Sequence, residues 1–221
     1  MIYILFAGGP IENIPPVSEI QRIYGSGDVK WIGVDRGVYY LLKENTQPDY
    51  AFGDFDSLSK EEKEWVDEYS LSLKVYPEEK DETDLEIALS WVLLRQDVEK
   101  VIIFGGTGGR LDHLFMNTQL LLKGLELDIP VILEDRSNRM FMKKPGSYTL
   151  TNSEANYISF LPMSKKVKGL TLTGFRYPLK EKEVVQGSSL CISNELRESQ
   201  GSYSFKEGIL MVFESSDHMH S

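Results

Sequence analysis

The chain has 221 residues and a formal net charge of -10, with 34 acidic against 24 basic side chains. A hydrophobic fraction of 41% is enough for one medium domain or two small ones, and it excludes fibrous and disordered classes. The acidic balance argues against a nucleic-acid partner, because the field of the whole protein repels a polyanion.

Several features bear on the compartment. No apolar run approaches the roughly 20 residues of a bilayer span. The first residues resemble a core strand and not a secretory signal. A single cysteine, Cys191, cannot form an internal disulfide, and three histidines make a poor zinc site. We therefore expect a cytoplasmic protein without membrane association.

Strands and helices are expected to alternate over the first 144 residues. The expected strands are 2–7, 29–34, 50–52, 73–76, 101–104 and 131–133, and the expected helices include 37–43, 59–69, 84–95 and 111–125. The helix at 84–95 is the clearest, since one face collects the apolar residues Leu85, Ala88, Leu89 and Val92. This alternation predicts right-handed crossovers and a largely parallel, Rossmann-like α/β sheet.

The pattern changes after Lys144-Pro145-Gly146. Short β-prone runs separated by turn residues follow, at 157–161, 169–173, 189–192 and 208–213. We therefore predict an α/β domain over 1–144 and an all-β domain over 145–221.

Two acidic clusters follow expected strands, where open α/β sheets place ligands. In Gly53-Asp54-Phe55-Asp56-Ser57, Asp54 and Asp56 point the same way if the segment is extended, as Mg²⁺ ligands would. The alternative is a turn in which Asp56 or Ser57 caps the next helix.

The second cluster packs five acids into residues 78–84, where they repel one another unless a cation neutralises them. Thr83 and Glu86 fit a capping box, which explains only part of the run. Asp84 is the candidate ligand, and Asp81, three residues earlier, could share its helical face.

A glycine-rich run, Gly105-Gly106-Thr107-Gly108-Gly109-Arg110-Leu111-Asp112-His113, follows the strand at 101–104. Exposed backbone N–H groups and the Arg110 fork suit a phosphate, although neither the dinucleotide nor the Walker A pattern is satisfied. A turn needs one or two glycines, so four favour a phosphate loop. His113 is either a helix residue or a ligand contact. Asp35 could hold a ribose hydroxyl or cap the helix after it.

Five motifs, in order along nearly the whole chain, resemble the bacterial thiamine pyrophosphokinases. They are 53–57, 81–84, 105–113, Thr173-Gly-Phe-Arg-Tyr-Pro-Leu179 and Ser193-Asn-Glu-Leu196. The resemblance implies an α/β catalytic domain, a C-terminal β-sandwich, and a homodimer with active sites at the subunit interface. It also implies Mg²⁺-dependent transfer of the pyrophosphoryl group of ATP to the hydroxyl of thiamine, which gives thiamine diphosphate and AMP.

The resemblance also assigns site residues. The metal ligands are Asp54, Asp56 and Asp84, with Asp81 and Arg110 as further catalytic residues. The nucleotide-binding residues are Asp35, Gly37, Gly105, Gly106, Thr107, Gly108, Gly109, Arg110, Asp112 and His113. The residues that approach thiamine are Tyr177, Ser193 and Asn194. One departure is Arg36, where the family often has glycine.

Three alternatives stay open at this point. The first is a pyrophosphokinase for another hydroxymethyl heterocycle, such as a pterin. The second is an aspartate-dependent phosphatase built on Asp54 and Asp56, which would leave the glycine loop without a use. The third is a non-enzymatic nucleotide sensor.

Overall fold

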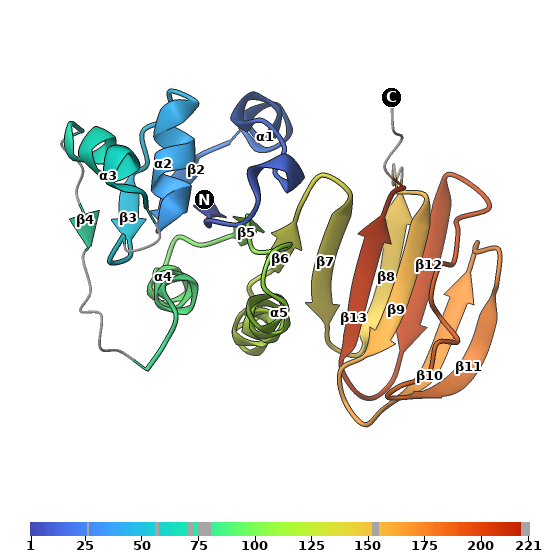
Figure 1. Cartoon of the computed structure of the whole chain (residues 1–221). Helices are drawn as coiled ribbons and strands as arrows, with labels where there is room; N and C mark the ends of the chain where they lie inside the picture. The colour runs from blue at the N-terminus through green and yellow to red at the C-terminus, as the bar shows by residue number, and fades with distance from the viewer. Residues whose placement is uncertain (26, 56–57, 70–72, 75–80, 152–154, 218–221) are drawn as a thin grey trace. The chain divides into compact units, whose positions relative to one another are not determined.

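The computed structural model of the chain describes residues 1–25, 27–55, 58–69, 73–74, 81–151 and 155–217. The chain divides into two compact units, Met1–Arg136 and Ser137–Ser221 (Figure 1). Within the described residues, every helix is too short or too polar to cross a membrane.

A parallel sheet forms the centre of the first unit. Its described strands run in the order β4-β3-β2-β1-β5-β6. Their bounds are β1 (Ile2–Phe6), β2 (Val29–Val34), β3 (Tyr50–Phe52), β4 (Leu73–Lys74), β5 (Lys100–Phe104) and β6 (Val131–Glu134). The central strands β1 and β5 are buried at four of their five positions, as expected for strands covered on both faces. The predicted parallel sheet is confirmed.

Helices cover both faces of this sheet, with α1, α2 and α3 on one and α4 and α5 on the other (Figure 1). Their bounds are α1 (Val17–Tyr24), α2 (Arg36–Lys43), α3 (Lys60–Asp67), α4 (Asp84–Leu93) and α5 (Leu111–Glu126), and a 3₁₀ turn, η1, spans Ile11–Asn13. The predicted apolar face of α4 is buried. Helix α1 was not predicted, although its buried Val17, Ile20 and Tyr24 have helical spacing.

Helix α3 begins one residue later than predicted. Its N-cap is Ser59, whose hydroxyl accepts a hydrogen bond from the Glu62 N–H at 3.2 Å. The Glu62 carboxylate in turn accepts one from the Ser59 N–H at 2.9 Å, which completes a capping box. The alternative, in which Asp56 or Ser57 caps this helix, is therefore wrong. Those two residues lie outside the described part of the chain.

The second unit is a β-sandwich. One sheet runs β7-β13-β9 and the other β11-β10-β12-β8, and every described pairing in them is antiparallel. The bounds are β7 (Asn138–Lys143), β8 (Gly146–Thr151), β9 (Tyr157–Pro162), β10 (Lys166–Thr173), β11 (Leu179–Val185), β12 (Gln200–Phe205) and β13 (Leu210–Ser215). Phe160 and Val212 from the first sheet share one core with Leu172 and Tyr203 from the second.

Two predictions for this region are corrected. The units divide at 136/137 and not at 144/145, because β7 pairs along its whole length with β13. The expected strand at 189–192 is a turn, in which the Ile192 N–H donates to the Ser189 carbonyl at 3.2 Å. This turn buries Cys191 and leaves Leu190 and Ile192 exposed, so the apolar run does not reflect a strand.

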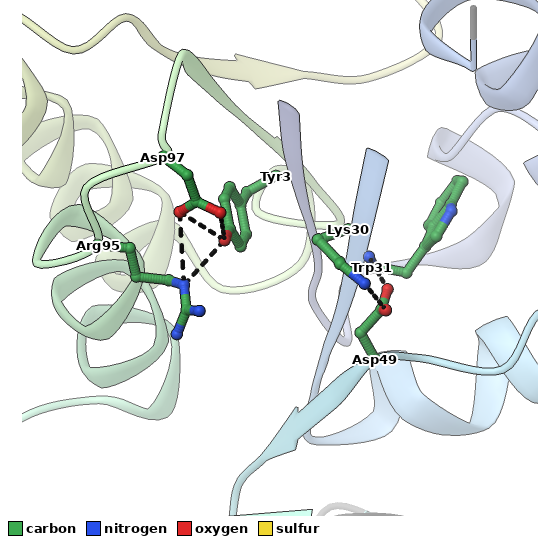
Figure 2. Close-up of polar contacts among 6 residues, drawn as sticks. All are labelled: Tyr3, Lys30, Trp31, Asp49, Arg95 and Asp97. Atoms are coloured by element: carbon green, nitrogen blue, oxygen red, sulfur yellow. Dashed lines mark hydrogen bonds and ion pairs between the residues drawn. The ribbon is translucent and has the colours of Figure 1, made fainter. Parts of the chain in front are cut away.

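Polar contacts secure the amino ends of the parallel strands (Figure 2). The Tyr3 hydroxyl accepts a hydrogen bond from Arg95 at 2.8 Å and donates to Asp97 at 3.1 Å. The Asp49 carboxylate pairs with the Lys30 ammonium at 2.6 Å and accepts the Trp31 N–H at 2.8 Å. These contacts hold β1 to the chain after α4, and β2 to the residue before β3. These contacts lie at the opposite end of the strands from the carboxyl ends, where open α/β sheets bind ligands.

Candidate active site

The order of strands reverses at β1, whose neighbours are β2 on one side and β5 on the other. The chain segments that leave β1 and β5 stay together, since the Ala7 N–H donates to the Phe104 carbonyl at 2.8 Å and the Gly9 N–H to the Gly105 carbonyl at 3.0 Å. Open α/β sheets bind ligands at the carboxyl ends of the strands beside such a reversal. Among the described residues, Asp35, Asp54 and the glycine-rich run lie at this edge, after β2, β3 and β5.

Three carboxylates meet there. Asp35 directly follows β2, Asp54 follows β3 by two residues, and Asp84 is the first residue of α4. One oxygen atom from each lies within 4.8 Å of the others, and all three residues are half-buried. Oxygen ligands at this spacing suit a hard divalent cation such as Mg²⁺. The group contains two of the three predicted metal ligands, Asp54 and Asp84, together with Asp35, which was predicted to hold a ribose hydroxyl or to cap a helix.

The backbone around Asp35 is specialised. Its φ is +49°, and its N–H donates to the Phe52 carbonyl at 2.8 Å. Gly53, with φ of +133°, lies so close that a methyl group there would overlap the Asp35 carboxylate. Although Asp35 occupies the N-cap position of α2, its side chain makes no capping hydrogen bond. The capping interpretation of Asp35 is therefore wrong, and its carboxylate belongs to the acidic group.

The predicted acidic residues differ in whether they join the three-carboxylate group. Asp54 and Asp84 come together as expected, and Asp56 lies outside the described residues. Asp81 is exposed, precedes α4 and is absent from the three-carboxylate group, so the shared helical face is wrong. Thr83 caps α4 as predicted, because its hydroxyl accepts the Glu86 N–H at 3.3 Å. The sequence signal for Asp35 was its position directly after a buried strand.

The glycine-rich run turns the chain from β5 into α5. Its glycines at 105, 108 and 109 all have positive φ, and Gly106 packs against Leu133, so the turn itself needs all four. The expectation that such a turn needs only one or two glycines is wrong here. Thr107 is buried and its hydroxyl donates to Asp135 at 2.8 Å, whereas residues 108 and 109 are exposed. Gly37, on α2, is buried, and an added Cβ there would overlap the Phe6 carbonyl, so the position requires glycine.

Arg110 is the last residue before α5, so its charge lies at the helix N-terminus. Its guanidinium donates to both oxygens of Asp112, at 3.1 and 2.6 Å, and 73% of the side chain is exposed. These hydrogen bonds lower the pKa of Asp112 to about 2 and raise the pKa of Arg110. His113 is exposed in the first turn. The pair orients a cation toward solvent beside the exposed glycines.

The predicted thiamine residues lie in the second unit and differ in exposure. The Tyr177 side chain is exposed, whereas Asn194 is 2% exposed. The Asn194 amide oxygen accepts from the N–H groups of Tyr177 at 3.0 Å and Glu195 at 2.9 Å, and its nitrogen donates to the Tyr177 carbonyl at 2.9 Å. Asn194 therefore holds the Tyr177 backbone. Ser193 is exposed, with φ of +54°.

Arg176, which sequence reasoning left without a role, joins this group. It pairs with Glu195 at 2.8 Å, and its guanidinium lies 5.5 Å from the centre of the Tyr177 ring. Arg176 thus contacts the Tyr177 ring, and Asn194 holds the Tyr177 backbone by hydrogen bonds.

Comparison with known proteins gives one consistent result. The family model for the thiamin pyrophosphokinase catalytic domain matches residues 24–133, and the model for the thiamin pyrophosphokinase vitamin B1 binding domain matches residues 147–210. The thiamine pyrophosphokinase of Bacillus subtilis (strain 168) is 44% identical over 214 residues, which cover 96% of this chain and 98% of that protein.

Two crystal structures are similar over almost the whole chain. The thiamine pyrophosphokinase of Bacillus subtilis superposes with a TM-score of 0.90, at 44% identity, over 98% of this chain and 100% of that one. The thiamin pyrophosphokinase of Geobacillus thermodenitrificans does so with a TM-score of 0.89, at 46% identity, over 99% of each chain.

Proposed function

The chain belongs to the thiamine pyrophosphokinase family, and from this premise we propose how its residues perform the family reaction. It is a thiamine diphosphokinase, which transfers the pyrophosphoryl group of ATP to thiamine. The matches do not favour the pterin, phosphatase or sensor alternatives. We propose that the first unit binds ATP and performs the chemistry, and that the second unit binds thiamine and dimerises.

The observation that carries the proposed site is the group of Asp35, Asp54 and Asp84, with oxygens within 4.8 Å of one another. Three like charges at this distance repel, so a bound cation would stabilise the group. We propose that they bind Mg²⁺, joined by Asp56 on the strength of the resemblance. When bound, Mg²⁺ would neutralise charge on the phosphates of ATP.

The glycine loop and Arg110 are proposed to hold the phosphates directly. The exposed backbone at Gly108 and Gly109 and the N-terminus of α5 favour an anion, and Arg110 adds a forked cation. Asp112 keeps that fork oriented, and His113 is exposed in the first turn beside it. For Gly105, Gly106 and Thr107 we propose support of the loop, since each is buried.

The reaction forms a bond from the thiamine hydroxyl oxygen to the β-phosphorus and breaks the bond from that phosphorus to the oxygen of AMP. Negative charge develops on the transferred group, and Arg110 with the loop N–H groups would stabilise it. Asp81, exposed before α4, is the proposed acceptor of the hydroxyl proton.

For thiamine, we propose that the exposed Tyr177 ring stacks on the cationic thiazolium. Ser193 is exposed in the neighbouring segment and would add a hydrogen bond, whereas Asn194 acts through Tyr177.

A homodimer with active sites between subunits is also proposed. Leu111 and Phe115 on α5 are 68% and 69% exposed, directly after the glycine loop, which is typical of a surface that a second copy covers. Mixing Tyr177→Ala with Asp54→Asn protomers should then restore one intact site per heterodimer. A mixture without activity, with the heterodimer confirmed, would contradict the shared site. The single buried thiol is consistent with the proposed cytoplasmic location.

The deciding experiment incubates the protein with ATP, thiamine and Mg²⁺ and measures AMP and thiamine diphosphate. Asp54→Asn should lower kcat by about 10²-fold, the scale for losing one electrostatic contact in such a site. Asp67→Asn makes the same change at an exposed residue of α3 and should leave kcat unaltered. Full activity in excess EDTA would overturn the metal site, and tight ATP binding without AMP release would favour a sensor.

A further inference from the structure

A side-chain bridge joins the two segments that carry Asp35 and Asp54. We infer that this bridge, made of Arg36, Glu62 and Ser59, positions the two carboxylates for the metal ion. The inference rests on the proposed metal site. It assigns Arg36 and Glu62 as positioning residues for the reaction, although neither belongs to the acidic group.

The bridge is well defined. Glu62 Oε1 accepts hydrogen bonds from Arg36 Nη2 at 2.6 Å and Nε at 3.2 Å. Its other oxygen, Oε2, accepts the backbone N–H of Ser59 at 2.9 Å. The Glu62 side chain is only 12% exposed and that of Arg36 40%, so water screens the ion pair less than it screens a pair on the open surface. One carboxylate therefore holds two distant points of the chain.

Those two points follow the acids along the chain. Arg36 directly follows Asp35 in the sequence, and Ser59 is the last residue before α3 in the connection from β3 that carries Asp54. On the strand side, the Asp35 N–H is already held by the Phe52 carbonyl at 2.8 Å. The bridge adds a second tie, which runs through Glu62 from the residue after Asp35 to Ser59, five residues after Asp54.

Asp35 needs such support, because its φ of +49° is unfavourable for a residue with a side chain. A strained residue keeps its conformation only when its surroundings enforce it. The bridge also neutralises the guanidinium charge next to the acidic group. A guanidinium without Glu62 would be attracted to those carboxylates and would compete with the metal ion for them.

A contact elsewhere in the same sheet provides a matched control. At the amino ends of β2 and β3, Asp49 pairs with Lys30 at 2.6 Å and accepts the Trp31 N–H at 2.8 Å (Figure 2). It has the same form, a carboxylate that takes a cation on one oxygen and a backbone N–H on the other. It lies at the opposite end of the strands from the acids.

The test measures Mn²⁺ binding to the whole protein without ATP or thiamine, by electron paramagnetic resonance of the free ion. Glu62→Gln loses the ion pair, but its amide oxygen can still accept the Ser59 N–H. We expect Glu62→Gln and Arg36→Met each to raise the Kd for Mn²⁺ about 10-fold, as for other groups that orient metal ligands. The double variant should be no worse than either single one, and Arg36→Lys should recover part of the affinity.

Two controls separate the possible results. Lys30→Met should change the Kd less than about twofold, since its ion pair is far from the acids. An equal loss in Lys30→Met, or an unaltered Kd in both bridge variants, would overturn the inference. Asp54→Asn should weaken Mn²⁺ binding. If it does and the bridge variants do not, only the inference fails. If Asp54→Asn leaves the Kd unaltered, the proposed metal site fails, and the inference fails with it.

Discussion

Replacing Asn194 by alanine separates positioning from direct contact in thiamine binding. The buried amide makes three hydrogen bonds, two as acceptor and one as donor, and two of the three are to the Tyr177 backbone. Each such bond contributes about 1 kcal/mol net, so Asn194→Ala should lower the free energy of unfolding by about 3 kcal/mol. Urea unfolding measures that loss.

The same change should weaken thiamine binding, because the Tyr177 ring would no longer be held in place. A stack between an aromatic ring and a cation contributes about 0.5 to 2 kcal/mol. Asn194→Ala should therefore raise the KM for thiamine by several-fold, up to about 30-fold, and leave the KM for ATP nearly unchanged. Tyr177→Ala should raise the thiamine KM similarly with little loss of stability, since its side chain is 56% exposed.

Two further variants sharpen this test. Asn194→Asp keeps the acceptor for both N–H groups but places a buried carboxylate oxygen against the Tyr177 carbonyl, so it should destabilise the protein at least as much as Asn194→Ala. Ser193→Ala alters the exposed neighbour and should leave stability unchanged. If Asn194→Ala destabilises the protein as expected while its KM for thiamine stays at the wild-type value, Asn194 does not position Tyr177 for thiamine.

The remaining predictions concern four sites. Gly53→Ala should lower activity and raise the Mg²⁺ concentration for half-activity, because the added methyl would displace the Asp35 carboxylate; a Mg²⁺ titration measures it. Arg110→Lys keeps the charge but loses the fork, so the KM for ATP should rise several-fold in steady-state kinetics. The Asp112 pKa, lowered from 3.8 to about 2, means that its pair with Arg110 is complete above about pH 4 and is lost only as the pH falls toward 2. An NMR titration should accordingly show no Asp112 step between pH 5 and 8. Burial raises the pKa of Cys191 to about 11, so a thiol reagent at pH 8 should modify the unfolded protein far faster than the folded one.

The fold could be predicted where local patterns reflect burial directly. The bounds of β2 and β3 match the prediction residue for residue, and the apolar face of α4 is buried as expected. Strand β11 was not predicted, since four of its seven residues are exposed in succession and show no alternation. The turn at 189–192 was predicted as a strand because apolar residues lie on both sides of its one buried position.

Local sequence patterns were sufficient to indicate the chemistry of the candidate site. Acids after buried strands and a glycine run before a helix indicated a metal and phosphates, because parallel strands bring their carboxyl ends to one edge. Which side chains meet, in contrast, depends on the packing of segments that are far apart in the sequence. Asp35 joins Asp54 because β2 and β3 are neighbours, and Asp84 reaches them because α4 crosses back over β3, β2 and β1. Such partnerships depend on strand order, and local patterns carry no record of strand order, since they report only how each segment is buried.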